Sequence, residues 1–236
     1  MKCRGMPSDP RAGGHSSIRA WTSPVLVTIL GCVAWWSAGG PEARAEGEGE
    51  YKAVGICCAW GNRLKDGVLT FSVAGTDATA LSIIHSAVHE WDEAFPDLTL
   101  EEVSPNWRKK SQRADITIVY GPGTADGGET HASGAQGLTT TYLNNRRMVT
   151  RVEIGVDGGP SPINAGAVEQ IAKHELGHAL GLGHANWDGD LMSPFVHPTP
   201  APIPICDINA VRKANSWKMI DNAKRPKPPS ATEAPC

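Results

Sequence analysis

The chain has 236 residues, of which 40% are hydrophobic and 20% are charged, and its formal net charge is −3 at pH 7. This composition excludes a fibrous or wholly disordered protein and is typical of one globular domain with extensions. The weakly acidic charge gives no basic field for binding a phosphate backbone, so we expect no nucleic-acid partner.

The first 45 residues have the layout of a secretory signal peptide. Basic residues precede an uncharged stretch from Ala20 to Pro41, and Ala43-Arg44-Ala45 supplies an A-x-A cleavage pattern. We therefore expect a secreted protein, extracellular or periplasmic, that acts as a monomer. Two alternatives stay open, an uncleaved signal anchor and lipidation at Cys32, because Ile29-Leu30-Gly31-Cys32 resembles a lipobox. Contact with a membrane is expected only in those two cases.

The patterns that follow predict an α+β domain over residues 68–223. Runs rich in β-branched residues predict strands at residues 68–73, 114–120, 137–142 and 152–156. Apolar residues at helical spacing predict helices over residues 77–95 and 165–180. Pro96 stops the first helix, and Asn164 is placed to cap the second. Strands followed by helices in this order favour a sheet with helices packed on it.

The regions flanking this domain are interpreted as a short leader, residues 46–67, and a proline-rich disordered tail, residues 224–236. Four cysteines remain beyond the signal peptide, and an oxidising compartment favours their pairing: Cys57, Cys58, Cys206 and Cys236. A bond between adjacent Cys57 and Cys58 would be strained, so we expect one of them to pair with Cys206. Which of the two does so stays open.

The second predicted helix contains the sequence His174-Glu175-Leu176-Gly177-His178. Two histidines four residues apart lie on one helix face, where they can bind a single ion such as zinc. Gly181 can adopt the positive φ that ends the helix, so the chain can return His184 as a third ligand. The fourth position of the metal is then open for water.

An open three-histidine zinc site lowers the pKa of its water toward about 7. Glu175 is placed to accept the proton of that water and to pass it to a leaving amine. The predicted chemistry is therefore hydrolysis of peptide bonds by a zinc-dependent endopeptidase.

The segment from His174 to His184 resembles the extended zinc motif of the metzincin metallopeptidases, and among these it is most similar to the matrixins. Asp190-Leu191-Met192-Ser193-Pro194 resembles their Met-turn, with Met192 beneath the zinc. The resemblance implies a twisted five-stranded mixed sheet, a long active-site helix and a C-terminal helix near residues 206–211. It also implies that a protein or peptide substrate binds in extended form along an edge strand, for which residues 137–142 are the candidate. Pro194, Phe195 and Val196 would form a wall of the main specificity pocket.

Other metals are less clearly indicated. Asp115 and Asp157 are similar to calcium ligands of the family, but each could equally cap a strand or a turn. A second, structural zinc is not expected, because residues 138–141 lack histidine and the preceding loop offers only His131. A different class of function stays open, a non-catalytic surface interaction module whose zinc is blocked by Cys57 or Cys58. The presence of Glu175 argues against it, since a structural site needs no base.

Overall fold

The structure is a computed structural model, and it describes residues 51–104, 113–122, 124, 136–157, 164–195, 197 and 199–236. The predicted signal peptide with Cys32, the loop residue His131 and the pocket residue Val196 lie outside the described residues. Within the described part of the chain, no helix is long and apolar enough to cross a membrane.

The main sheet is mixed, as expected for an α+β domain. Among the described residues it contains six strands: β2 (Ala59–Trp60), β3 (Val68–Ala74), β4 (Thr99–Glu102), β5 (Ile116–Tyr120), β6 (Gly137–Leu143) and β7 (Met148–Val156). All neighbouring pairs are parallel except β6, which runs antiparallel to β7. Five strands were expected. The additional one, β2, is two residues long, too short to produce an alternating hydrophobic pattern.

Strand β6 pairs only with β7 among the described strands, so it is an edge strand as predicted. Its connection to β7 is a tight turn organised by Asn144. The side-chain oxygen of Asn144 accepts hydrogen bonds from the backbone N–H groups of Arg146 (2.8 Å) and Met148 (3.1 Å). Arg147 adopts a φ of 60° within this turn. The turn thereby connects the edge strand directly to its partner β7.

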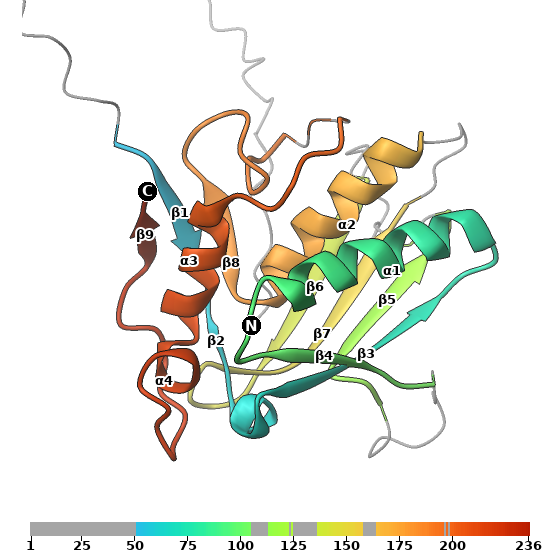
Figure 1. The fold of residues 1–236 in the computed structure, drawn as a ribbon. Coiled ribbons are helices and arrows are strands. Elements are labelled where there is room, and N and C mark those ends of the chain that lie inside the picture. The colour runs from blue at the N-terminus through green and yellow to red at the C-terminus, as the bar shows by residue number, and fades with distance from the viewer. Residues whose placement is uncertain are drawn as a thin grey trace, which may run out of the picture. The chain divides into compact units, whose positions relative to one another are not determined.

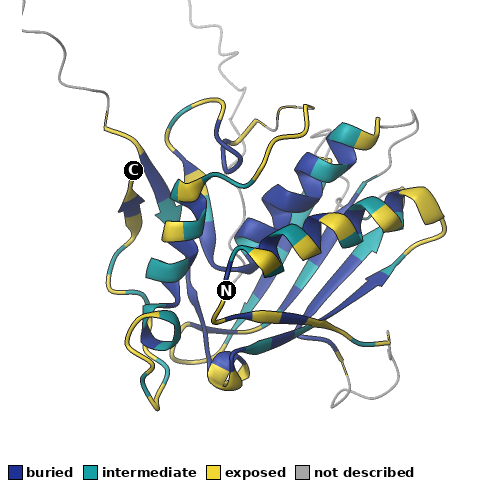
Figure 2. Ribbon diagram, viewed as in Figure 1, coloured by how far each residue is buried: buried dark blue, intermediate teal, exposed yellow. Residues whose placement is uncertain are grey.

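Two helices, α1 (Ala78–Glu93) and α2 (Ala165–Ala179), lie side by side on one face of this sheet (Figure 1). Each begins at a side-chain cap. The Asp77 carboxylate accepts from the N–H groups of Thr79 and Ala80, and the Asn164 side chain accepts from that of Ala167 at 2.8 Å. These caps satisfy backbone donors that the first turn of a helix leaves unpaired. The buried faces of both helices point toward the sheet (Figure 2).

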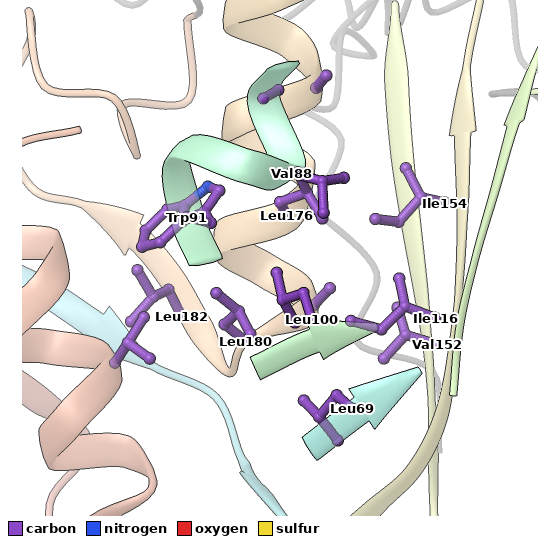
Figure 3. Packing of buried hydrophobic residues seen from close by; sticks show 14 of the residues in the cluster. Leu69, Val88, Trp91, Leu100, Ile116, Val152, Ile154, Leu176, Leu180 and Leu182 are labelled. Atoms are coloured by element: carbon purple, nitrogen blue, oxygen red, sulfur yellow. The ribbon is translucent and has the colours of Figure 1, made fainter. Parts of the chain in front are cut away.

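The main hydrophobic core fills the space between the two helices and the sheet (Figure 3). Trp91 of α1 is fully buried, and its indole N–H donates to the carbonyl of Lys173 in α2 at 3.0 Å. This hydrogen bond joins the two helices. The labelled side chains of Figure 3 come from strands β3, β4, β5 and β7, from both helices, and from the chain just after α2: Leu69, Val88, Trp91, Leu100, Ile116, Val152, Ile154, Leu176, Leu180 and Leu182.

A second, three-stranded antiparallel sheet adjoins the end of α2. Its order is β8 (Leu182–Ala185), β1 (Ala53–Ile56), β9 (Glu233–Pro235), and helix α3 (Ile205–Ala214) packs against it. The 3₁₀ helix η1 (Asn62–Asp66) precedes β3, and the short helix α4 (Ser216–Met219) follows α3.

The structure corrects two predictions about the flanking regions. The described part of the 46–67 leader belongs to the folded domain, because β1, β2 and η1 lie within it. The tail over residues 224–236 is not wholly irregular, because Ala234 in β9 is 3% exposed and pairs with Val54. A strand of three residues beside several prolines carries no apolar periodicity, so the sequence pattern could not reveal it.

The single disulfide among the described residues joins Cys206 to Cys236, with 5.5 Å between the Cα atoms. The prediction that Cys206 pairs with Cys57 or Cys58 is therefore wrong. Strand β9 brings Cys236 to the first turn of α3, where Cys206 lies. The backbone N–H groups of Cys57 and Cys58 instead donate to the carbonyl of Gly181, beyond the opposite end of β1.

Loss of this disulfide should destabilise the folded protein by about 3 to 4 kcal/mol, because closing a loop of this length restricts the unfolded chain. We expect the Cys206→Ala/Cys236→Ala double variant to unfold at a lower urea concentration than the wild type. A reducing agent should lower the wild-type midpoint to the same value and leave that of the double variant unchanged. Equal midpoints for the oxidised wild type and the double variant would contradict this assignment.

Candidate metal centre

Three histidines converge where α2 ends and β8 begins. His174 and His178 lie on one face of α2, and His184 comes from β8. Their candidate ligand nitrogens all lie within 4.8 Å of one another. Within the described part of the chain, these histidines form the one cluster of at least three side chains that could bind a metal. Neither Cys57 nor Cys58 belongs to it. The structure therefore assembles the three residues that the spacing predicted.

The return of His184 depends on a sharp reversal of the chain at Gly181. This residue has a φ of 108°, in the left-handed region that favours glycine. A Cβ atom at Gly181 would also collide with the backbone carbonyl oxygen of Cys58. Glycine is thus required twice, for the backbone conformation and for the close approach of the preceding segment.

The last carbonyl groups of α2 are satisfied by side chains from outside the helix. The indole N–H of Trp60 donates to the carbonyl of Ala179, and the side-chain amide of Asn215 donates to that of Leu180, both at 2.9 Å. Trp60 and Asn215 are themselves buried and hydrogen bonded to each other through the Trp60 backbone N–H. These contacts fix the point at which the helix stops, and so the position of His184.

Backbone carbonyls orient two of the three imidazole rings. Nδ1 of His174 lies 2.7 Å from the carbonyl oxygen of Leu191, and Nδ1 of His178 lies 3.0 Å from that of Leu182. A carbonyl only accepts a hydrogen bond, so Nδ1 carries the proton in both rings. The Nε2 atoms are left with their lone pairs available for a metal.

The three histidines are neutral at neutral pH. Burial lowers the pKa of His174 to about 3, with a further contribution from neighbouring His178. Burial likewise lowers the pKa of His178, and it lowers that of His184 to about 4 together with the influence of His178. Neutral imidazoles are the form that binds zinc, so no proton has to be displaced.

This donor set fits zinc. Tetrahedral zinc with Zn–N bonds of about 2.0–2.1 Å requires nitrogens separated by about 3.4 Å. Small rotations of the rings bring nitrogens that already lie within 4.8 Å to that spacing. His174, His178 and His184 would hold the ion and leave one position of the tetrahedron for another ligand.

The side chain of Glu175 in α2 contacts the edge strand β6. It is 6% exposed, and the hydroxyl of Thr139 in β6 donates to its carboxylate at 2.6 Å. Burial raises the pKa of Glu175 to about 7, and the hydrogen bond from Thr139 opposes that rise. Gly137 allows this closeness, because a Cβ atom there would collide with the Glu175 carboxylate. The carboxylate is thus fixed against the edge along which an extended chain could pair.

Thr139 was missed from the sequence. It is one of three consecutive threonines, and nothing in their composition separates them. Only the alternation of a strand would have indicated that Thr139 and Thr141 face the helices while Thr140 faces away.

Met192 occupies the place beneath the histidine helix that the Met-turn resemblance implied. It is fully buried, and a Cβ atom on Gly177 of α2 would collide with its sulfur. Its N–H donates to the Asp190 carboxylate at 2.9 Å, and its carbonyl accepts from the N–H of Ala185 in β8 at 2.7 Å. The turn therefore supports both α2 and the strand that carries His184.

A pair of buried acids lies behind this turn. Asp207 of α3 is fully buried and interacts with Asp190, which is 7% exposed. Burial, followed by the negative charge of Asp190, raises the pKa of Asp207 from its ordinary 3.8 to about 8. If both groups were ionised, neither would carry a hydrogen to donate to the other. At neutral pH the pair therefore retains one proton, which can be shared between the two groups. No motif in the sequence pointed to this pair.

Asp207 in the folded protein thus keeps a proton that the unfolded chain releases above about pH 4. The contribution of Asp207 to the free energy of unfolding therefore decreases as pH rises from about 4 to about 8. Asp207→Asn cannot ionise and should escape that loss. We expect its melting temperature, relative to wild type, to rise steadily over this range. Exposed Asp221→Asn serves as control, and a difference independent of pH would contradict the shared proton.

The two aspartates considered for calcium have different surroundings. Asp115 accepts hydrogen bonds from the backbone N–H and the hydroxyl of Thr70, both at 2.9 Å, and pairs with Arg63 at 3.4 Å. Its charge is therefore already matched, and the structure favours its alternative role of capping a strand. Asp157 follows β7, where its N–H donates to the carbonyl of Gln136. Neither belongs to a metal-binding cluster in the described part of the chain, and calcium at Asp157 stays a prediction.

A helix that carries two histidines and a glutamate, stacked over a buried methionine turn, defines a domain of the metzincin metallopeptidase type. The family model described as matrixin matches residues 62–214, more than half of the chain. The chain belongs to the matrixin family.

Individual relatives are more distant. No curated protein matches the chain. Among solved structures, the chain is similar to two structures of myroilysin. Each match has 17% sequence identity and a TM-score of 0.33 and covers 50% of this chain. The matches cover 48% and 45% of those chains, so this protein spans about half the length of each.

Proposed function

We propose that the protein is a secreted zinc-dependent endopeptidase that hydrolyses peptide bonds in extended segments of protein substrates. The observation that carries the proposal is the position of Glu175, which directly follows the metal-binding His174 in α2 and whose buried carboxylate is held by Thr139 of edge strand β6. A base, a metal cluster and a strand edge meet at this one place.

Zinc, when bound, supplies the Lewis acidity that lowers the pKa of water and polarises the scissile carbonyl. The protein's own residues handle the proton. Glu175 accepts a proton from the attacking water and delivers it to the leaving nitrogen. The Thr139 hydroxyl holds one carboxylate oxygen through its hydrogen bond, so Glu175 keeps a single orientation.

Strand β6 is suited to hold the substrate. The backbone of its outer edge is unpaired among the described strands, so an extended peptide can add to it through main-chain hydrogen bonds. Such bonds recognise any sequence, and pockets for side chains then provide selectivity. This mode of binding supports an endopeptidase acting on protein or peptide substrates.

A catalytic role is favoured over a surface module with a blocked zinc. In the described region, the metal-binding group contains the three histidines and neither Cys57 nor Cys58. A site without a fourth protein ligand is typical of catalytic zinc. Secretion is supported by the signal-peptide pattern of residues 1–45, and we propose a monomer in keeping with the predicted single domain.

The test is Glu175→Gln, which preserves the size of the side chain and an oxygen that can accept from Thr139. We expect kcat/KM for a quenched-fluorescence peptide library to fall by about 10²- to 10⁴-fold, the usual contribution of a general base. Zinc content should stay at one ion per chain. Exposed Glu93→Gln at the end of α1 is the matched control and should cleave at the wild-type rate.

Removing zinc from the wild type with a chelator should abolish cleavage, and adding zinc back should restore it. A Glu175→Gln variant as active as wild type would overturn the assignment of the base. Wild-type protein that binds one zinc and cleaves none of the peptides would overturn the proposed function.

A further inference from the structure

The side chain of Thr139 contacts the proposed general base from the neighbouring strand. Helix α2 packs against β6, and the Thr139 hydroxyl lies 2.6 Å from a carboxylate oxygen of Glu175. The hydroxyl oxygen also lies 3.1 Å from the backbone carbonyl oxygen of Glu175. Its single hydrogen goes to the carboxylate, which is the nearer acceptor and the one that can be charged. Both residues are buried, with exposed fractions of 9% and 6%, so little water competes for this contact.

The backbone of Thr139 faces the open edge of the sheet. Neighbouring residues along a strand direct their backbone N–H and C=O groups to opposite sides. In β7, the N–H of Val152 and the carbonyl of Val156 both form hydrogen bonds on the β5 side. Ile154 shares this direction, and it is the residue opposite Thr139. In an antiparallel pair, opposite residues either bond to each other or both face away, so the N–H and C=O of Thr139 point away from β7.

A hydrogen bond at the end of the hairpin supports the same register. The N–H of Asp157 donates to the carbonyl of Gln136 at 2.8 Å, so the pair just beyond the two strands is bonded. Bonded and non-bonded pairs alternate along an antiparallel hairpin. The residues of β6 whose backbone can pair with an added strand are therefore Gly137, Thr139 and Thr141. Thr139 is the middle one of the three.

Thr139 thus combines two requirements of the reaction in one residue. Its main chain lies where an extended substrate can pair, and its side chain holds the base. We propose that Thr139 is a positioning residue that couples main-chain pairing of the substrate to the alignment of Glu175. The inference rests on the proposed peptidase function and adds a rule of substrate selection. A peptide is cleaved at the full rate only if its main chain can bond to Thr139.

The coupling follows from the stiffness of a β-branched side chain. Threonine has few allowed χ1 values, so its hydroxyl moves with its backbone. Among the described strands, only β7 restrains the backbone of β6. A substrate strand adds hydrogen bonds from the other side, which restrain the Thr139 backbone and, through the hydroxyl, the Glu175 carboxylate. A reacting group misplaced by about 1 Å costs about 10²-fold in rate, so the restraint should affect kcat.

The test combines a change in the full-length protein with a change in the substrate main chain. Thr139→Val removes the hydroxyl and keeps the shape of the side chain. An ester scan of a cleaved peptide replaces one amide at a time, outside the scissile bond, with an ester that cannot donate a hydrogen bond. In the wild type we expect one ester position to lower kcat about fivefold. Thr139→Val alone should lower kcat for the all-amide peptide about tenfold and change KM by less than about twofold.

The coupling is measured by applying both changes together. In Thr139→Val, the same ester should lower kcat by less than about twofold, because the base no longer responds to pairing. The ester should still raise KM, since the main-chain hydrogen bond is lost in both proteins. Thr139→Ser keeps the hydroxyl and should restore kcat. Exposed Thr99→Val in β4, at the other edge of the sheet, is the matched control and should keep the wild-type kcat and ester response.

Rates are compared only between folded proteins that hold one zinc per chain. Thr139→Ala, which places no methyl group against the carboxylate, decides the question if Thr139→Val does not fold. Equal losses of kcat from the ester in the wild type and in the variant would overturn the coupling, as would a Thr139→Ser variant as slow as Thr139→Val. In either case the proposed function stands. If the zinc-loaded wild type cleaves no peptide at all, the proposed function fails and this inference fails with it.

Discussion

The three-histidine cluster forms because the chain reverses its direction at Gly181. The reversal converts the end of the histidine helix into the start of β8, and only this reversal lets a third imidazole join the two on α2. The surrounding structure is arranged to hold it. Trp60 and Asn215 cap the final carbonyls, the Cys58 carbonyl occupies the space a side chain would need, and β1 pairs with the returning strand.

Several buried ionisable groups of this protein are either uncharged or paired with groups of opposite charge. The histidines are neutral because burial disfavours their charged form, and Asp207 keeps a proton for the same reason. Lys173 remains charged beneath the surface because two carboxylates and a carbonyl meet its ammonium. The Lys173 contacts tie α1 and the segment before α3 to α2, and the interaction of Asp207 with Asp190 links α3 to the Met-turn.

The parts of this molecule that sequence could predict are those encoded within a few residues. The apolar spacing of α1, the cap of α2 at Asn164 and the histidine motif are local patterns, and the structure confirms the helices, that cap and the cluster. The parts that were missed depend on partners far along the chain. Cys206 finds Cys236 only because β9 pairs with β1, Thr139 contacts Glu175 across two elements, and Lys173 meets Glu90 on another helix. Contacts between residues so far apart in the sequence leave no local periodic pattern from which they could be predicted.

The strand pairing around β8 also has a consequence for when the metal site can form. Val54 pairs with Ala185 beside His184 on one side and with Ala234 on the other, so the small sheet joins segments from nearly the whole described chain. Contacts between residues so distant in sequence form slowly, because a long loop must close before they contribute any stability. We therefore expect the third histidine to be held in place late in folding, after the two on α2 have their helix. A chain that is still folding lacks the complete cluster, which delays any hydrolytic capacity until the domain has assembled.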